Sequence, residues 1–250
     1  MNLVVCITQV PDTATRLKID AGGKRIEEQD VTLVLNPYDE FAVEAAVQAR
    51  EAGTAEKVTV VAVGPEAVSG ALRNALALGC DEAVHLTTDS PIDDPLQQAR
   101  ALAAWLNGVD ADLILTGKQS VDDDTQAQGP MLATLLGRPC LTEAVTLELD
   151  DSRISITREV EGGKQQVSAA LPAVVTTQKG LNEPRYASLK GIMAAKKKEI
   201  AELAAETGEA GLEVVTLTLP PPRPEGTIVG EGPDAVSELV RLLREEAKVI

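Results

Sequence analysis

The chain has 250 residues, of which 44% are hydrophobic and only 2% aromatic, and its formal net charge is −16. This length allows one α/β domain with appendages or two small domains. The negative charge disfavours nucleic acids and lipid head groups as partners. The single histidine and the three cysteines lack the short repeated spacings of a zinc site or a disulfide framework.

The first residues lack the basic start and the long apolar run of a signal peptide. No stretch approaches the roughly 20 apolar residues of a membrane-spanning helix. We therefore expect a cytoplasmic protein with no direct membrane insertion.

Short apolar runs alternate with helical patterns through the first half of the chain. Residues 3–7, 58–63, 83–86 and 113–116 are almost continuously apolar, which is typical of strands buried on both faces of a parallel sheet. Between them, periodicity predicts helices over 37–52, 66–78 and 96–106, the first with Asn36 as N-cap and Pro37 at its first position. The pattern predicts a doubly wound, mainly parallel α/β sheet, Rossmann-like and adenine nucleotide α-hydrolase-like, with strand order 3-2-1-4-5.

Turn residues predict two antiparallel additions. Gly22 and Gly23 indicate a small hairpin over 18–26. Segments 144–149, 153–160 and 165–170, separated by turns at 150–151 and 161–164, predict an antiparallel meander.

The pattern changes after residue 180. We expect a polar loop over 181–186, a helix over 192–206, a strand over 214–219, a linker over 220–224 and an amphipathic helix over 233–246. Residues 1–180 would form the ligand-binding α/β domain, and residues 181–250 an arm that packs on a partner subunit. The alternative is a C-terminal helix docked on its own domain.

Two loops follow the first and fourth predicted strands, at the edge where open α/β sheets bind ligands. They are residues 8–12 and 117–130. The second is not a phosphate-binding loop of the Walker type, because Gln119 follows Gly117-Lys118. An anion bound there would have to accept hydrogen bonds from the backbone N–H groups in the first turn of the next helix, with Thr125, Gln126 and Gln128 as side-chain donors.

Plainer interpretations of this loop remain open. Asp124 or Thr125 could be the N-cap of the next helix, with the rest a solvated turn. Three consecutive aspartates cannot all face one cation, so we expect no metal site. His85 and Cys6 suit packing better than catalysis, and a Gly-x-Ser-x-Gly elbow is absent, so we predict no catalytic residue.

Five motifs in order carry a family resemblance. They are Val10-Pro11-Asp12; Asn36-Pro37-Tyr38-Asp39-Glu40; Gly117-Lys118-Gln119 with Asp122-Asp123-Asp124; residues 158–163 leading to 171–176; and residues 181–189 followed by 192–198. With them the chain resembles the β subunit of electron transfer flavoprotein over its full length. The resemblance implies a heterodimer whose α subunit supplies most of the site for a redox-active FAD, while the β subunit buries a structural AMP.

The resemblance also implies site residues. Tyr38 would line the flavin edge, because Thr8 and Thr13 replace the Lys and Tyr that other members carry. The cofactor-binding positions would be Cys6, Asn36, Pro37, Tyr38, Asp39, Val63, Gly117, Lys118, Gln119, Ser120, Val121, Asp122, Asp123, Asp124, Thr125, Gln126, Ala127 and Gln128.

The implied partner contacts lie later in the chain. A recognition loop containing Arg185 and Tyr186 would end at Leu189, which anchors in an apolar pocket of a partner dehydrogenase. Glu159 would pair with an arginine of the α subunit and hold the mobile flavin domain at rest.

The implied function is that of an electron carrier without substrate turnover of its own. It would accept electrons from flavin dehydrogenases, such as acyl-CoA dehydrogenases, and pass them to a quinone oxidoreductase. One alternative is an electron-bifurcating β subunit with a second FAD in place of AMP; such members tend to have Gly where this chain has Asp123, which favours AMP. Two others are a nucleotide-hydrolysing α/β enzyme and a nucleotide-stabilised interaction module with no redox role.

Overall fold

A computed structural model describes residues 1–27, 29–150, 152–223 and 225–250. Its contacts divide the chain into two units, Met1–Thr216 and Leu217–Ile250. Asp151 of the predicted meander turn and Pro224 of the predicted linker lie outside the described residues.

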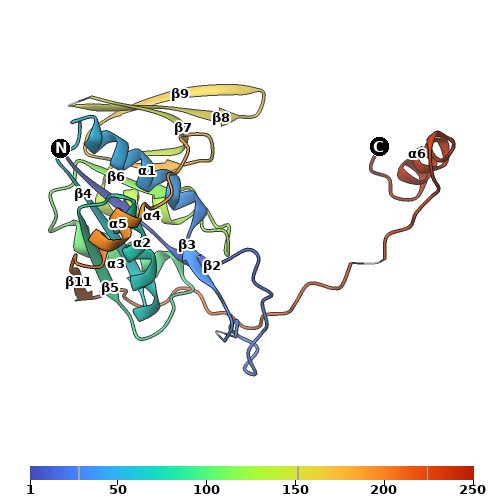
Figure 1. Ribbon diagram of the computed structural model, residues 1–250, viewed down its shortest axis with the longest axis horizontal. Coiled ribbons are helices and arrows are strands. Elements are labelled where there is room, and N and C mark those ends of the chain that lie inside the picture. The colour runs from blue at the N-terminus through green and yellow to red at the C-terminus, as the bar shows by residue number, and fades with distance from the viewer. Residues whose placement is uncertain (28, 151, 224) are drawn as a thin grey trace. The chain divides into compact units, whose positions relative to one another are not determined.

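Nine strands of the first unit form one sheet in the order β11-β5-β4-β1-β6-β10-β7-β8-β9 (Figure 1). Neighbours from β11 to β7 are parallel, and β7, β8 and β9 are antiparallel. The predicted order 3-2-1-4 is confirmed by β5-β4-β1-β6, and β10 takes the fifth place. The strands are β1 (Asn2–Cys6), β4 (Lys57–Gly64), β5 (Glu82–Thr87), β6 (Leu113–Gly117), β7 (Cys140–Leu149), β8 (Arg153–Val160), β9 (Gly163–Ala170), β10 (Ala173–Thr177) and β11 (Ile200–Ala204).

Helices cover both faces of the parallel strands, as a doubly wound sheet requires. The face that contains Leu3 and Val5 packs against α1 and α2, and the face that contains Val4 packs against α3 and α4. Both sides of each central strand are therefore buried, which explains their continuous apolarity. The helices are α1 (Pro37–Glu51), α2 (Ser69–Leu78, preceded by the 3₁₀ turn η1, Glu66–Val68), α3 (Pro95–Leu106), α4 (Gln128–Leu136) and α5 (Leu189–Ala195).

The predicted helix over 192–206 is wrong. Residues 189–195 form α5, and the chain then extends into β11, which lies parallel to β5 at one end of the sheet. Hydrogen bonds with the open edge of β5 outweigh the weak helical pattern of this segment.

The predicted strand over 214–219 is also wrong, because no strand covers those described residues. The preceding segment instead runs along α3, where Gln97 donates to the Gly208 carbonyl (3.0 Å) and the Gly211 N–H donates to Asp94 (2.7 Å). Residues 181–216, which the sequence assigns to the arm, belong to the first unit.

Both predicted antiparallel additions are present. The 18–26 hairpin has one bridge, Ile19 to Ile26, and the meander is β7-β8-β9, with β7 starting earlier than expected. A separate ribbon pairs β2 (Gln9–Pro11) with β3 (Leu33–Leu35), which the sequence analysis did not predict.

The second unit contains the predicted amphipathic helix. It consists of the 3₁₀ turn η2 (Pro233–Ala235) and α6 (Val236–Glu245). Val236, Leu239 and Val240 are exposed on one side of α6, and Arg241 pairs with Glu238 and Glu245 on the other. Among the described residues, no helix is long and apolar enough to cross a bilayer.

Candidate functional site

The two loops that the sequence places at a common edge of the sheet do meet there. Thr8, which follows β1, and the loop after β6 line the same small cavity of about 20 Å³. The first turn of α3 closes its other side. The lining residues are Thr8, Pro95, Gln98, Gln119, Ser120, Asp123, Thr125, Ala127 and Gln128; we call this site the crevice.

Asp39 joins the ends of the two strands that flank the crevice. Its carboxylate accepts one hydrogen bond from the Thr8 N–H and another from the Gly117 N–H, both at 2.7 Å. The side chain is buried, and this burial raises its pKa to about 7, although the two N–H groups act in the opposite direction. The predicted cofactor ligand Asp39 is therefore a brace between β1 and β6 in this structure.

Asn36 fixes the loop after β6 to the start of α1. Its amide donates to the Gln119 carbonyl (2.9 Å) and accepts from the Val121 N–H (3.3 Å). Asn36 is the N-cap residue of α1, as predicted, although its side chain makes no capping hydrogen bond to the helix. Because this loop lies beside α1, its backbone groups take the capping side chain.

The rest of the loop is held by contacts within itself. Asp123 accepts hydrogen bonds from the Ser120 hydroxyl (2.8 Å) and from the N–H (3.0 Å) and hydroxyl of Thr125. Gln119 donates to Asp124 and accepts from Gln126. Residues 122–126 are exposed, so this part of the loop depends on few contacts with the body.

Helix α4 begins at Gln128 with Ala127 as its N-cap, so neither Asp124 nor Thr125 caps it as one interpretation proposed. The start of α4 lies directly against two strand ends, because a Cβ at Gly129 would overlap the Thr176 methyl group. Beside it, the buried Thr116 hydroxyl has no hydrogen-bond partner among the described residues.

Sequence reasoning missed the contribution of α3. Pro95 and Gln98 line the crevice, and Gln98 accepts a hydrogen bond from Gln128 (3.4 Å). The only available signal was the Asp94-Pro95 helix start after a strand, which occurs in any βα unit.

The other predicted cofactor residues lie around the crevice rather than in it. Cys6 is buried at the end of β1, where burial raises the pKa of its thiol. Val63 is half-buried near the end of β4, and Pro37 is exposed. Lys118 lies 5.5 Å from the centre of the Tyr38 ring.

Lys118 also pairs with Glu143 at 3.6 Å. His85, which the sequence favours as a packing residue, is buried, and its Nε2 lies 2.8 Å from the Gly64 carbonyl oxygen.

The predicted partner residues fall in two places. Glu159 is exposed on β8, 4.0 Å from Lys164. Arg185, Tyr186 and Leu189 lie in residues 181–198, which we call the docking segment. Tyr186 is 98% exposed and Leu189 83% exposed, whereas Arg185 is turned toward α1.

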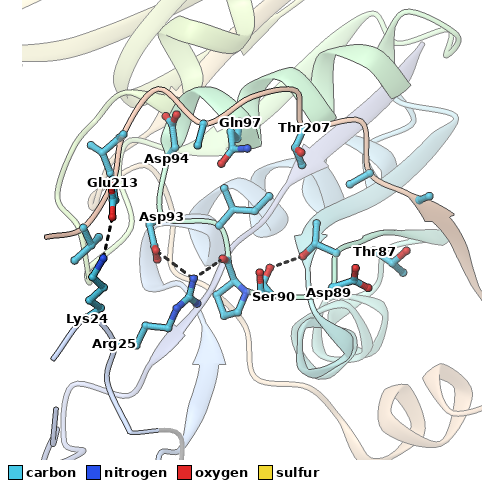
Figure 2. A pocket seen from close by; sticks show the side chains of 18 residues that line it. Lys24, Arg25, Thr87, Asp89, Ser90, Asp93, Asp94, Gln97, Thr207 and Glu213 are labelled. Carbon is cyan, nitrogen blue, oxygen red and sulfur yellow. Dashed lines mark hydrogen bonds and ion pairs between the residues drawn. The ribbon is translucent and has the colours of Figure 1, made fainter. Parts of the chain in front are cut away.

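A second, larger cavity of the first unit lies elsewhere, with a volume of about 700 Å³. Figure 2 shows Lys24 paired with Glu213, and Arg25 with Asp93. Both cations among its lining residues are therefore already neutralised, so this cavity offers no free positive charge to a phosphate.

Comparison with known proteins decides the family. Residues 24–207 match the family described as electron transfer flavoprotein domain. A relative from Bacillus subtilis, named electron transfer flavoprotein subunit beta, is 39% identical over 100% of both chains. A relative of the same name from Bradyrhizobium diazoefficiens is 41% identical, and one from Arabidopsis thaliana, named as the mitochondrial β subunit, is 37% identical, each over 100% of both chains.

The chain belongs to the electron transfer flavoprotein β-subunit family. The resemblance drawn from its five motifs is thereby confirmed. Among the described residues of this β subunit, no group of three or more His, Cys, Asp or Glu side chains is placed to hold a metal ion.

The crevice of this β subunit fits a nucleotide in chemistry but not in its present volume. Amides of Gln98, Gln119 and Gln128, the hydroxyls beside them and the first N–H groups of α4 are donors suited to phosphate and ribose oxygens. A cavity of about 20 Å³ holds roughly one water molecule. A nucleotide is larger than this volume, so its binding would require residues 119–127 to move outward.

Proposed function

We propose that this chain is the β subunit of a heterodimeric electron transfer flavoprotein and holds AMP in the crevice. The observation that supports this proposal is the set of hydrogen-bond donors in the crevice. They are side-chain amides, hydroxyls and the backbone N–H groups at the start of α4, and no lysine or arginine is among the lining residues. Such donors suit a nucleotide that is kept rather than hydrolysed, because hydrolysis needs a cation on the phosphates. Asp123, which holds Ser120 and Thr125 together within the loop, favours AMP in place of a second FAD, because bifurcating members tend to have Gly at this position.

The FAD is held mostly by the α subunit, with Tyr38 along its edge. Tyr38 is half-buried at the start of α1, and Lys118 and Glu143 lie beside it. When bound, FAD supplies the group that accepts and releases electrons, and this chain supplies position. The protein is then a carrier without substrate turnover of its own.

The docking segment is the contact for electron donors. Leu189 is a large apolar side chain that is almost fully exposed on the first turn of α5, and Met193 lies one turn later at 67% exposure. A small exposed apolar anchor of this kind suits a transient complex. We assign the donors to flavin dehydrogenases of the acyl-CoA type, and the acceptor to a quinone oxidoreductase.

Two further surfaces belong to the α subunit. The apolar side of α6, with Val236, Leu239 and Val240, would pack on it, so the second unit is an arm of the heterodimer. Glu159, exposed on β8, would pair with an arginine of the flavin domain. The cytoplasmic location stays a prediction from the sequence.

Identifying the bound nucleotides tests the assignment of the crevice. The chain is purified with its α partner, and the released nucleotides are identified by mass. One FAD and one AMP per heterodimer are expected. Two FAD without AMP would favour the bifurcating alternative, ATP turnover would favour a hydrolase, and a colourless heterodimer would favour an interaction module.

A single substitution tests the docking segment. Leu189→Ala is expected to raise the KM for a reduced acyl-CoA dehydrogenase about ten-fold, since a hot-spot side chain contributes roughly 1 to 2 kcal/mol or more. Flavin content and assembly should not change. The matched control is Leu203→Ala, which removes an exposed leucine from β11 outside this segment. Equal KM values for the two variants would remove the docking assignment.

A further inference from the structure

Arg185 lies in the docking segment, but its guanidinium group faces the body of the protein. Nε and Nη2 donate to Glu44 at 2.8 and 3.1 Å, and Nη1 and Nη2 donate to Glu51 at 2.7 and 2.9 Å. These bonds use four of the five N–H groups that an arginine has. Little hydrogen-bonding capacity remains for a partner protein.

Glu44 makes this anchor strong. Its side chain is 5% exposed, and a buried carboxylate is stable only when it is paired and hydrogen-bonded. The Arg185 backbone N–H also donates to Glu44, at 3.3 Å, so main chain and side chain of the segment are fixed by one residue of α1. Nearby, Asn182 donates to the Phe41 carbonyl at 2.9 Å.

The other end of the docking segment is fixed to α2. Arg73 donates to the carbonyls of Ala195 (2.5 Å) and Lys198 (2.6 Å), which close the end of α5. Lys198 in turn donates to the Cys80 carbonyl at 2.7 Å. Between them Gly191 touches α2, where a Cβ would overlap the Ala77 carbonyl. The segment is thus held at both ends, and its middle carries the exposed Leu189.

We propose that Arg185 is a positioning residue, which presents Leu189 to the partner dehydrogenase without touching that partner. This inference rests on the docking function proposed above. A segment fixed before binding loses less conformational entropy when the complex forms. Removing the Arg185 anchor should therefore weaken docking through the order of the segment rather than through a lost contact.

The test compares Arg185→Gln, Leu189→Ala and the double variant in the full heterodimer, with a reduced acyl-CoA dehydrogenase as electron donor. Arg185→Gln is expected to raise the KM for the dehydrogenase about ten-fold with little change in kcat, because ordering of the segment is then completed during binding. Amide hydrogen exchange of residues 186–193 should become faster. The double variant should be little worse than Leu189→Ala alone, because coupled residues are not additive.

Arg50→Gln is the matched control. Arg50 lies on α1, as Glu44 and Glu51 do, and it pairs with Asp81; no hydrogen bond or ion pair found among the described residues joins it to the docking segment. It should leave KM and exchange unchanged. Glu51→Gln removes only the more exposed of the two carboxylates that bind Arg185. It should raise KM and speed amide exchange as Arg185→Gln does, but by a smaller amount. This variant tests the positioning role if Arg185→Gln does not assemble.

Additive effects of Arg185→Gln and Leu189→Ala with unchanged exchange would show that Arg185 contacts the partner, and would overturn the positioning role. If Leu189→Ala alone leaves KM unchanged, the docking function itself fails. The amide exchange rates of Arg185→Gln and Arg50→Gln then still show whether Arg185 orders the docking segment, because they are measured without any dehydrogenase present.

Discussion

The crevice and the docking segment are both held by α1, through two buried carboxylates in opposite electrostatic settings. Asp39 accepts hydrogen bonds from the backbone N–H groups of Thr8 and Gly117, and burial raises its pKa to about 7. Burial acts on Glu44 as well, but hydrogen bonds from Arg185 and Gln48 outweigh it and hold the pKa of that carboxyl below its ordinary value. Among the described residues no cation is paired with Asp39, whereas Arg185 is paired with Glu44.

The difference fits the role that we propose for each region. A crevice loop that closes mainly on itself can open for a nucleotide at the cost of a few hydrogen bonds. A docking segment fixed at both ends presents the same anchor to every partner. The comparison therefore predicts which substitutions change the free energy of unfolding, which change nucleotide binding, and which change neither.

The largest expected effect is a change in pH dependence at Asp39. Between its ordinary pKa of 3.8 and the folded value of about 7, the unfolded chain is ionised while the folded chain keeps a proton. Stability from this group therefore falls as pH rises through that window, by at most about 1.4 kcal/mol per pH unit, and levels off above it. Urea denaturation of parent and Asp39→Asn, at fixed heterodimer concentration, measures the difference.

Glu44→Gln should show the opposite sign. Because the folded pKa of Glu44 lies below its ordinary value of 4.5, the parent's advantage over this variant is present above that pH and is lost as pH falls through the folded value. A flat difference between parent and Asp39→Asn from pH 4 to 7 would mean that the N–H groups of Thr8 and Gly117 keep Asp39 ionised, and would contradict the contrast between the two sites.

The second effect concerns the floor of the crevice. Gly129→Ala puts a methyl group into the Thr176 side chain and should lower the free energy of unfolding by about 1 to 3 kcal/mol. The AMP content of the purified heterodimer should fall as α4 shifts. Gly163→Ala is the control, because a Cβ there meets nothing within 4 Å. Equal nucleotide content in both variants would show that the start of α4 takes no part in binding.

The sequence predicted what depends on local pattern. The central strands were found because burial on both faces makes them continuously apolar, and α1 was found because Pro37 follows a polar residue and precedes regular apolar spacing. The strand β11 was missed because its order comes from the edge of β5, not from its own residues. A pattern cannot show a contact made by distant segments.

The same reason limits the prediction of the site. The loop after β6 was identified from its position in the topology, but the long-range hydrogen bonds of the predicted site residues were not. Asp39 was expected to touch a cofactor, and it joins the ends of β1 and β6, residues that are far apart in sequence. Arg185 was expected at the partner surface, and its guanidinium is bound to α1.

The smallest expected effect tests how weakly the crevice loop is closed. Asp123→Ala removes the acceptor shared by the Ser120 hydroxyl and the Thr125 N–H, two solvent-exposed bonds of roughly 0.5 to 1.5 kcal/mol each at most. Global stability should hardly change, but exchange of bound nucleotide against labelled AMP should become several-fold faster, because the closed loop is what opening must disrupt. Asp122→Ala is the control, since Asp122 is also exposed and makes no side-chain hydrogen bond among the described residues. If both variants exchange AMP at the parent rate, the loop is not the gate, and the outward movement that the crevice needs must come from the start of α3 instead.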